Sequence, residues 1–353
     1  MSALRVCWFG IYDPSYPRND ILLRGLRTNG AEIIECHADW RDKNRYKILR
    51  EKLRALDGAY DIVYAAHPSP GPVLVAKLVS RKPVVMDALY SMFDAAVNDR
   101  QEMPWYHPRA MKLWILDWLS ALACDAMVVD TIEDQKYWSR FPFVRASKML
   151  VLYTGIQEQI FYPAEHEPAG REFLVSFHGF YIPLQGVDRI VEAARLLRDE
   201  PDIRFRFIGS GQLSKKVDGL IEKYGLTTIE QVGRKTSEEV AALSREAHVV
   251  LGIFGATNKA QRVVPNKVYE GLGLRKPVIT MDTPAVREIF DDADLLLIDN
   301  APESIAQAIR SLKADPAHAR EIAERGHAKV TTRYSPTPLG GQLLDFLVQL
   351  SSR

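Results

Sequence analysis

The sequence has few cysteines, no long uncharged apolar run and almost no excess of one charge, and each shortage excludes a class of protein. Its three cysteines, Cys7, Cys36 and Cys124, are too few and too widely spaced for a disulfide framework or a cysteine zinc site. No run reaches the roughly 18 uncharged apolar residues of a membrane span, and residues 1–5 show no signal-peptide pattern. These absences predict a cytoplasmic protein. Forty-six Lys and Arg residues against 45 Asp and Glu give a net charge of +1, which argues against nucleic-acid binding.

Motifs for metal ions and covalent nucleophiles are also missing. We find no motif that would hold a divalent metal on phosphates, no His/Cys ligand cluster and no Gly-x-Ser-x-Gly elbow. The first strand-to-helix loop has one glycine, Gly10, and so carries no dinucleotide-binding fingerprint. The sequence therefore predicts neither a metal nor a dinucleotide cofactor.

What the sequence does contain is a regular alternation of apolar and amphipathic segments. Its 353 residues, 47% of them hydrophobic, suit two domains of average size. Short apolar runs such as 4–9, 61–66 and 126–129 alternate with helical stretches, and a second series starts near residue 173. Such continuous apolar strands indicate parallel sheets covered on both faces. We expect an α/β protein of two Rossmann-like, doubly wound domains facing a cleft, joined through the Pro- and Gly-rich residues 153–170.

One charged cluster stands out in the second half of the chain. Pro265 begins a predicted helix, and Lys259, Arg262 and Lys267 crowd its start. Glu270 lies one turn inside the helix on the face of Lys267. The N–H groups of a helix start attract anions, so the cations would hold phosphates while Glu270 accepts hydrogen bonds from ribose hydroxyls. A solvated charged loop before an ordinary helix is the alternative.

Residues 265–288 (PNKVYEGLGLRKPVITMDTPAVRE) resemble the nucleotide-sugar site of glycosyltransferase family 4, a group of enzymes with the GT-B fold. Four further matches occur in the family's order across residues 151–290. They are the linker at 151–163, the loop His178-Gly179-Phe180 through Asp188, the turn 207–211 and the element 231–234. Residues 1–150 resemble the family only in outline.

The resemblance implies a glycosyltransferase that moves a sugar from a UDP- or GDP-sugar to a saccharide or lipid-linked acceptor in polysaccharide or glycoconjugate biosynthesis. It further implies retention of configuration, with neither metal nor cofactor. Residues 1–160 would bind the acceptor, 161–335 the nucleotide sugar, and helix 336–353 would pack back on the first domain. The candidate catalytic residues are His67, Lys267 and Arg262. The candidate donor-binding residues are Gly179, Gln185, Gly186, Gly209, Gly211, Arg234, Asn266 and Glu270.

The sequence departs from the family at three charged positions. The family has Arg after Gly179, Lys before Gly186 and Glu eight residues before Glu270. This chain has Phe180, Gln185 and Arg262 there. We expect the phosphate charge to be held instead by Arg262, Lys267 and Arg234, because a buried diphosphate needs cationic or N–H partners. A non-catalytic partner or scaffold protein, and a nucleotide-sugar epimerase of the same fold, are the alternatives.

The first half offers less specific candidates. His67 follows the strand at 61–66 and is either a site residue or a solvated turn residue. Gly10 and Arg18 are acceptor-side candidates, although a surface arginine on the first helix is the simpler account of Arg18. Asp130 is expected to cap the helix that starts near Thr131.

Two segments suggest contact with an anionic membrane. Residues 41–54 hold seven cations and two acids, and residues 105–122 are aromatic and apolar with three tryptophans. A solvated helix and a core helix are the respective alternatives, and for 105–122 core burial is favoured because the segment is apolar most of the way round.

Overall fold

The chain divides into two compact units in the computed structural model, which describes residues 3–165 and 172–352. Unit 1 comprises Met1–Gly155 together with Tyr334–Arg353, and unit 2 comprises Ile156–Arg333. The chain thus leaves unit 1 once and returns to it at its end. Residues 166–170 of the expected connecting segment lie outside the described residues.

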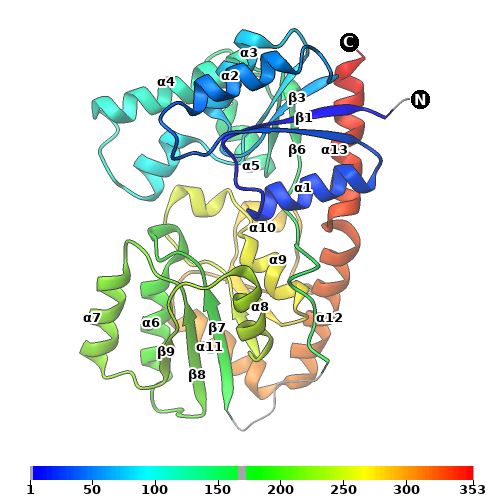
Figure 1. Cartoon of the computed structure of the whole chain (residues 1–353). Helices are drawn as coiled ribbons and strands as arrows, with labels where there is room; N and C mark the ends of the chain where they lie inside the picture. The colour runs from blue at the N-terminus through cyan, green and yellow to red at the C-terminus, as the bar shows by residue number, and fades with distance from the viewer. Residues whose placement is uncertain (1–2, 166–171, 353) are drawn as a thin grey trace. The chain divides into compact units, whose positions relative to one another are not determined.

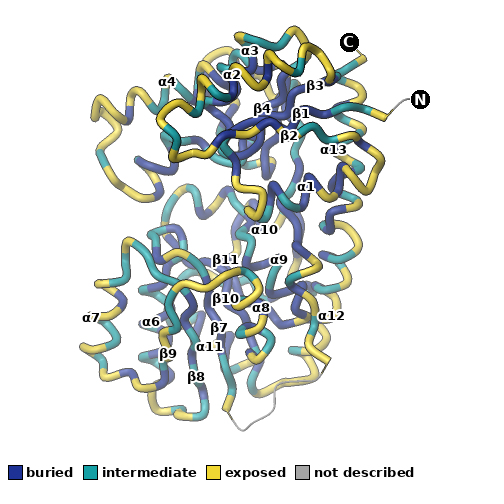
Figure 2. Tube along the Cα trace, in the orientation of Figure 1, coloured by how far each residue is buried: buried dark blue, intermediate teal, exposed yellow. Residues whose placement is uncertain are grey.

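Unit 1 is built on a six-stranded parallel sheet with the order β2-β1-β3-β4-β5-β6 (Figure 1). Its strands are β1 (Arg5–Gly10), β2 (Glu32–His37), β3 (Ile62–Ala65), β4 (Val84–Asp87), β5 (Ala126–Val129) and β6 (Met149–Val151). The central strands β3, β4 and β5 are buried at every position, and Figure 2 shows β3 and β4 in dark blue. Continuous burial is what a parallel sheet with helices on both faces requires.

Helices cover both faces of this sheet. One face packs on α1 (Pro17–Thr28) and α13 (Pro336–Ser351). The other carries α2 (Arg45–Ala55), α3 (Pro70–Val79), α4 (Pro108–Ala123) and α5 (Ile132–Trp138), with a π-helix η1 (Asp94–Asp99) and a 3-10 turn η2 (Ala146–Lys148) between them.

The contact between α1 and α13 is a backbone contact through two glycines. A Cβ atom on Gly25 would overlap the Pro336 carbonyl oxygen, and one on Gly340 would overlap the backbone of Gly25. The two helices can approach this closely because neither glycine has a side chain.

Replacing Gly340 by alanine should therefore lower the free energy of unfolding by about 1–3 kcal/mol, the usual cost of overpacking. Gly341→Ala is the matched control, because its Cβ would meet only the side chain of Asn29, at 3.3 Å. That substitution should be neutral or raise stability by up to about 1 kcal/mol through helix propensity. Urea unfolding of both variants measures the difference, and equal stabilities would contradict the close contact.

Unit 2 contains a second six-stranded parallel sheet, with the order β12-β11-β10-β7-β8-β9. Counted along unit 2, this is the 3-2-1-4-5-6 order of a Rossmann fold. The strands are β7 (Phe173–His178), β8 (Ile203–Ile208), β9 (Ile229–Gln231), β10 (Val249–Leu251), β11 (Val278–Met281) and β12 (Leu296–Ile298). The helices are α6 (Val187–Leu196), α7 (Ser214–Tyr224), α8 (Ser237–Arg245), α9 (Asn266–Gly273), α10 (Pro284–Arg287), α11 (Pro302–Ala314) and α12 (Pro316–Arg333), with 3-10 turns η3 (Pro183–Gln185) and η4 (Asn258–Gln261).

Each sheet has one point at which the order of the strands reverses. In unit 1 it lies between β1 and β3, and in unit 2 between β7 and β10. Connections on the two sides of such a point run to opposite faces and leave a crevice at the carboxyl ends of the strands, where doubly wound proteins bind their ligands. The loops after β7 and β10 are therefore the first place to look for a site in unit 2.

Candidate functional site

Close backbone packing shapes the carboxyl end of β7. Gly179 and Gly209, which follow β7 and β8, have φ angles of +134° and +146° that side-chain-bearing residues rarely adopt. A Cβ on Gly209 would overlap the carbonyl oxygen of Gly179, and one on Gly211 would lie 2.7 Å from the backbone nitrogen of Tyr181. Three predicted donor-binding glycines thus join two loops into one backbone surface without side chains.

Gln185 and Gly186 connect this surface to the loop after β10. The carbonyl of Gln185 accepts a hydrogen bond from the Phe254 N–H at 3.1 Å. A Cβ on Gly186 would lie 2.5 Å from the carbonyl carbon of Phe254, so only glycine fits there. Both residues therefore lie at the reversal of strand order, where the fold predicts a ligand.

Glu270 projects from α9 onto the end of β7. Its Oε2 lies 2.6 Å from Nε2 of His178, the last residue of β7, and both side chains are largely buried. Among the described residues, His178 is the one hydrogen-bond partner of this carboxylate, whose Oε1 is left to accept others. His178 was not among the residues predicted for the site. Its position directly before Gly179 in the matched loop is the signal that would have found it.

Lys267 is a buried ammonium group at the same place. Its Nζ donates a hydrogen bond to Oε1 of Gln185, lies 4.1 Å from the centre of the Phe177 ring and is 3.0 Å from where a Cβ on Gly179 would sit. Burial lowers the pKa of Lys267 to about 7, while the charge of Glu270 opposes that shift. An amine with this pKa gains its full charge when an anion binds beside it.

The start of α9 offers further groups to an anion. Pro265 is its N-cap residue and provides no side-chain cap for the N–H groups of the first turn, which begins with Asn266. Arg262 is buried in the segment between η4 and α9. Its place in the donor site stays a prediction.

Arg234 lies beside the backbone surface formed by Gly179, Gly209 and Gly211. Its Nε donates to Oγ of Ser210 at 2.9 Å, and its guanidinium lies 5.0 Å from the centre of the exposed Phe180 ring. The phenylalanine that replaces the family's arginine thus stacks against an arginine from the loop after β9.

In unit 1, Gly10 and His67 lie at the carboxyl ends of β1 and β3, where the strand order of that sheet reverses. Gly10 has a φ of +145°, and a Cβ there would lie 3.5 Å from the carbonyl oxygen of Ala66. His67 is buried between Tyr16 and Tyr90, with ring centres 5.0 Å and 4.7 Å away. The alternative of a solvated turn residue is therefore wrong for His67.

Arg18 is fully buried, which corrects the expectation of a surface or acceptor-binding side chain. Its Nε donates to both carboxylate oxygens of Asp87, at 2.8 Å and 3.0 Å, and its Nη1 donates to the carbonyl of Leu152 at 2.9 Å. Burial raises the pKa of Asp87 and the charge of Arg18 opposes that rise. Arg18 thus links α1 to the strand ends rather than to a ligand.

Asp130 also has a different role from the one expected. Thr131 is the N-cap residue of α5, and its hydroxyl accepts from the Asp134 N–H at 3.0 Å. Asp130 instead accepts from the hydroxyl of Thr154 at 2.8 Å. The threonine was overlooked because both residue types cap helices well.

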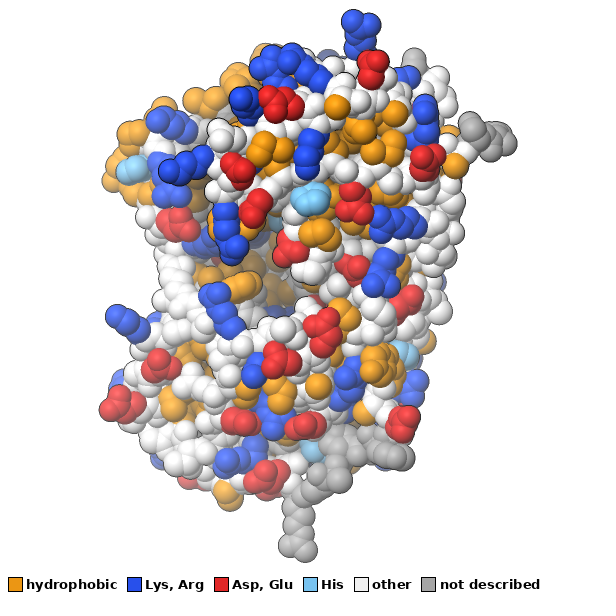
Figure 3. Space-filling view, viewed as in Figure 1, with side chains coloured by type: hydrophobic (Ala, Val, Ile, Leu, Met, Phe, Trp, Pro, Cys, Tyr) orange, Lys and Arg blue, Asp and Glu red, His pale blue; other side chains and the backbone are white. Residues whose placement is uncertain are grey.

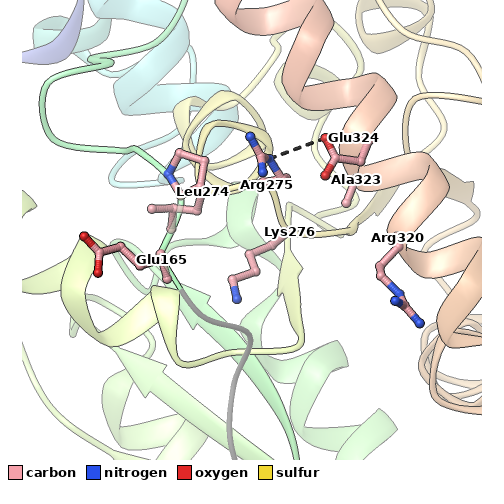
Figure 4. A pocket seen from close by; sticks show the side chains of 9 residues that line it. Glu165, Leu274, Arg275, Lys276, Arg320, Ala323 and Glu324 are labelled. Carbon is pink, nitrogen blue, oxygen red and sulfur yellow. Dashed lines mark ion pairs between the residues drawn. The ribbon is translucent and has the colours of Figure 1, made fainter.

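A separate hollow of about 190 Å³ lies in unit 2 near the amino end of β11, at the opposite end of the strands from the candidate site (Figure 4). It is lined by Arg275 and Lys276, just before β11, and by residues of α12. Arg275 there forms an ion pair with Glu324, Nε to Oε2, at 3.4 Å. Because ligands of doubly wound sheets bind at the carboxyl ends of the strands, this hollow at the amino end of β11 is not the candidate site.

Residues 3–165 and 172–352 contain neither a cluster of metal ligands nor a membrane-spanning helix. No group of three or more His, Cys, Asp or Glu side chains there could hold a metal ion. No helix in that part of the chain is long and apolar enough to cross a membrane.

Comparison with known proteins finds a family model that matches unit 2. Residues 158–329, almost all of unit 2, match the model of the family Glycosyl transferases group 1. Unit 2 is therefore similar to proteins of that family over almost its whole length.

Curated relatives agree at the level of sequence. An uncharacterized glycosyltransferase of Methanocaldococcus jannaschii is 28% identical over 189 residues, 51% of this chain and 48% of that protein. The putative colanic acid biosynthesis glycosyl transferase WcaI of Escherichia coli is 28% identical over 151 residues, 40% of this chain and 36% of WcaI. The chain spans about half or less of the length of these relatives.

Solved structures show the fold. HepE of Anabaena in complex with UDP-glucose has a TM-score of 0.76 at 14% identity, covering 98% of this chain and 100% of HepE. Sucrose-phosphate synthase of Thermosynechococcus elongatus has a TM-score of 0.78 at 15% identity, covering 99% of each chain. The predicted fold class, an α/β GT-B protein with two Rossmann-like domains, is confirmed.

Proposed function

We propose that the chain is a glycosyltransferase that binds a nucleotide-diphosphate sugar at the β7–β10 crevice of unit 2. The sugar would pass to a saccharide or lipid-linked acceptor in polysaccharide or glycoconjugate biosynthesis. The observation that carries the proposal is the buried ammonium of Lys267 beside Gln185 and the side-chain-free surface at Gly179. The match of unit 2 to the glycosyltransferase group 1 model and the structural similarity to HepE, solved with UDP-glucose, support the donor class.

Lys267 supplies the positive charge that the family pattern places elsewhere. The family's lysine stands where this chain has Gln185, and the Lys267 ammonium reaches the Gln185 side chain from α9. The cation therefore enters the same crevice from a different element. This geometry favours an enzyme whose phosphate-binding charge has moved to another element. It disfavours the alternative of a non-catalytic protein.

The chemistry follows from where charge develops. As the sugar leaves with oxocarbenium character, negative charge builds on the nucleoside diphosphate. Lys267 and the uncapped N–H groups at the start of α9 stabilise that charge in a place shielded from water. Glu270, held in orientation by His178, accepts hydrogen bonds from the ribose hydroxyls. Arg262 is proposed to support the same diphosphate. Retention of configuration, without metal or cofactor, is proposed from the family resemblance.

The acceptor is proposed to bind in unit 1 beside His67. The rings of Tyr16 and Tyr90 flank this histidine at the reversal of strand order. Aromatic faces suit the apolar faces of sugars. Gly10, at the end of β1, allows backbone to approach a ligand there.

The test is a panel of UDP-, GDP- and dTDP-sugars, scored by calorimetry and by release of the nucleoside diphosphate with and without saccharide acceptors. Binding of one donor, followed by acceptor-dependent release, supports the proposal. Absence of binding to every donor favours the scaffold alternative. Conversion of the donor sugar without any acceptor favours an epimerase.

Donor affinity should depend on pH through Lys267. Its pKa is about 7 in the free protein, and the bound diphosphate favours the charged form. Affinity should therefore be constant below that pH and fall by up to about tenfold per pH unit above it. Dissociation constants measured from about pH 6 to about pH 9 test this. Lys267→Arg, which stays charged throughout, should give a flat profile. A flat profile in the unsubstituted protein would contradict the role of Lys267.

A further inference from the structure

The outer face of α4 in unit 1 carries large apolar side chains that the core does not cover. Met111, Ile115 and Leu119 follow one another at intervals of four residues and are 54%, 43% and 42% exposed. On the inner side, Trp114 and Trp118 pack against the core, with the Trp114 and Phe141 ring centres 5.5 Å apart. The expectation of core burial is thus right for one face of this helix and wrong for the other.

The apolar surface continues on both sides of this stripe. Trp105 and Tyr106, just before α4, are both more than half exposed. On the far side, Trp118 donates its indole N–H to the carbonyl of Pro142 at 2.9 Å, which holds the loop after α5 against the helix. Phe143, next in that loop, is 85% exposed. We call these six side chains the α4 patch: Trp105, Tyr106, Met111, Ile115, Leu119 and Phe143.

Cations without acidic partners surround the patch. Arg109 and Lys112 lie on α4, and Arg140 and Arg145 flank Phe143. None of the four forms an ion pair with any described residue. Residues 139–149 contain no acid at all, and Asp117 on α4 is buried, where it accepts from the hydroxyl of Ser91 at 2.6 Å. Figure 3 shows orange and blue side chains gathered over the region where Figure 1 places α4.

We propose that the α4 patch binds the surface of an anionic lipid bilayer. Exposed apolar side chains enter the boundary between headgroups and acyl chains, and the surrounding cations pair with headgroup phosphates. Trp and Tyr suit this boundary because each has an apolar ring and a polar group. Two copies of the chain joined through this patch would instead bring its cations together, which disfavours a dimer. The interaction is peripheral and is independent of the donor site in unit 2.

Flotation of the full chain with lipid vesicles tests the proposal. Vesicles of phosphatidylcholine are compared with vesicles of equal parts phosphatidylcholine and phosphatidylglycerol. We expect binding to the anionic vesicles, weakened as salt rises above about 0.1 M. Arg140→Gln with Arg145→Gln should weaken binding by roughly 25-fold, about fivefold for each charge. Ile115→Ser with Phe143→Ser should weaken it by about tenfold or more.

Val348→Ser provides the matched control. Val348 is 40% exposed, an exposed fraction similar to that of Ile115. It lies on α13, however, which covers the opposite face of the sheet. This variant should bind as the unsubstituted chain does, and circular dichroism should show every variant folded. Failure to bind anionic vesicles, or an equal loss in the control, would overturn the proposal. So would sedimentation showing dimers that Ile115→Ser with Phe143→Ser abolishes in the absence of lipid.

Discussion

Replacing Lys267 by methionine should lower kcat/KM for the nucleotide-sugar donor by roughly 10²–10³-fold, the usual effect of removing one buried group that stabilises a developing anion. Methionine keeps most of the volume and the apolar packing on Phe177 but removes the ammonium beside Gln185. The free energy of unfolding should stay the same or rise, because a buried cation is replaced by an apolar chain. Steady-state kinetics and urea unfolding of the same sample measure both effects.

Lys276→Met is the matched control for this experiment. Lys276 is nearly as buried as Lys267, at 7% against 4% exposure, but lies at the amino end of β11 beside the separate hollow. Its substitution should leave kcat/KM within about threefold. Lys276 lies at the opposite ends of the strands from the candidate site, and long-range charge effects are weak. If both variants lose activity alike, or if Lys267→Met retains it, the assignment of Lys267 to the diphosphate fails.

Replacing Glu270 by alanine should abolish detectable donor binding. A carboxylate that accepts two ribose hydroxyls contributes about 1.5–3 kcal/mol for each hydrogen bond, so the expected loss in affinity exceeds about 10²-fold. Glu270→Gln keeps the shape of the side chain and loses its charge. Its donor affinity should lie between those of the unsubstituted protein and Glu270→Ala. Calorimetry with the donor selected by the nucleotide-sugar panel gives the affinities.

A 2′-deoxyribose analogue of the nucleotide makes the test specific to the ribose. The unsubstituted protein should bind the analogue more weakly than the parent nucleotide, whereas Glu270→Gln should distinguish the two much less. Glu324→Ala, which removes a carboxylate at the other edge of the sheet, should preserve the full difference. Equal discrimination by Glu270→Gln and the unsubstituted protein would assign Glu270 to another role, such as fixing His178.

Much of the fold could be predicted from the sequence because its signals are local. Continuous apolar segments such as those of β3 and β5 indicate a parallel sheet covered on its two faces. In the structure every residue of these two strands is buried. The shared face of Lys267 and Glu270 follows from their three-residue spacing on a helix. In the structure both side chains reach the end of β7.

Contacts between residues far apart in sequence could not be predicted in this way. Arg18 looks like a surface residue of the first helix until the fold places it beside Asp87, 69 residues later. His178 gains its role only because α9 directs Glu270 toward it across 92 residues. The outer face of α4 stays uncovered because its neighbours pack only against the other side, which the composition of the helix alone does not reveal.

The return of the chain to unit 1 has a consequence for the order of folding during synthesis. Residues 156–333 are continuous, so unit 2 can fold as soon as they leave the ribosome. The apolar face of α1 must wait for α13, which is translated after unit 2, and until then this face lacks the helix that covers it. The domain that is translated first is therefore the one that matures second.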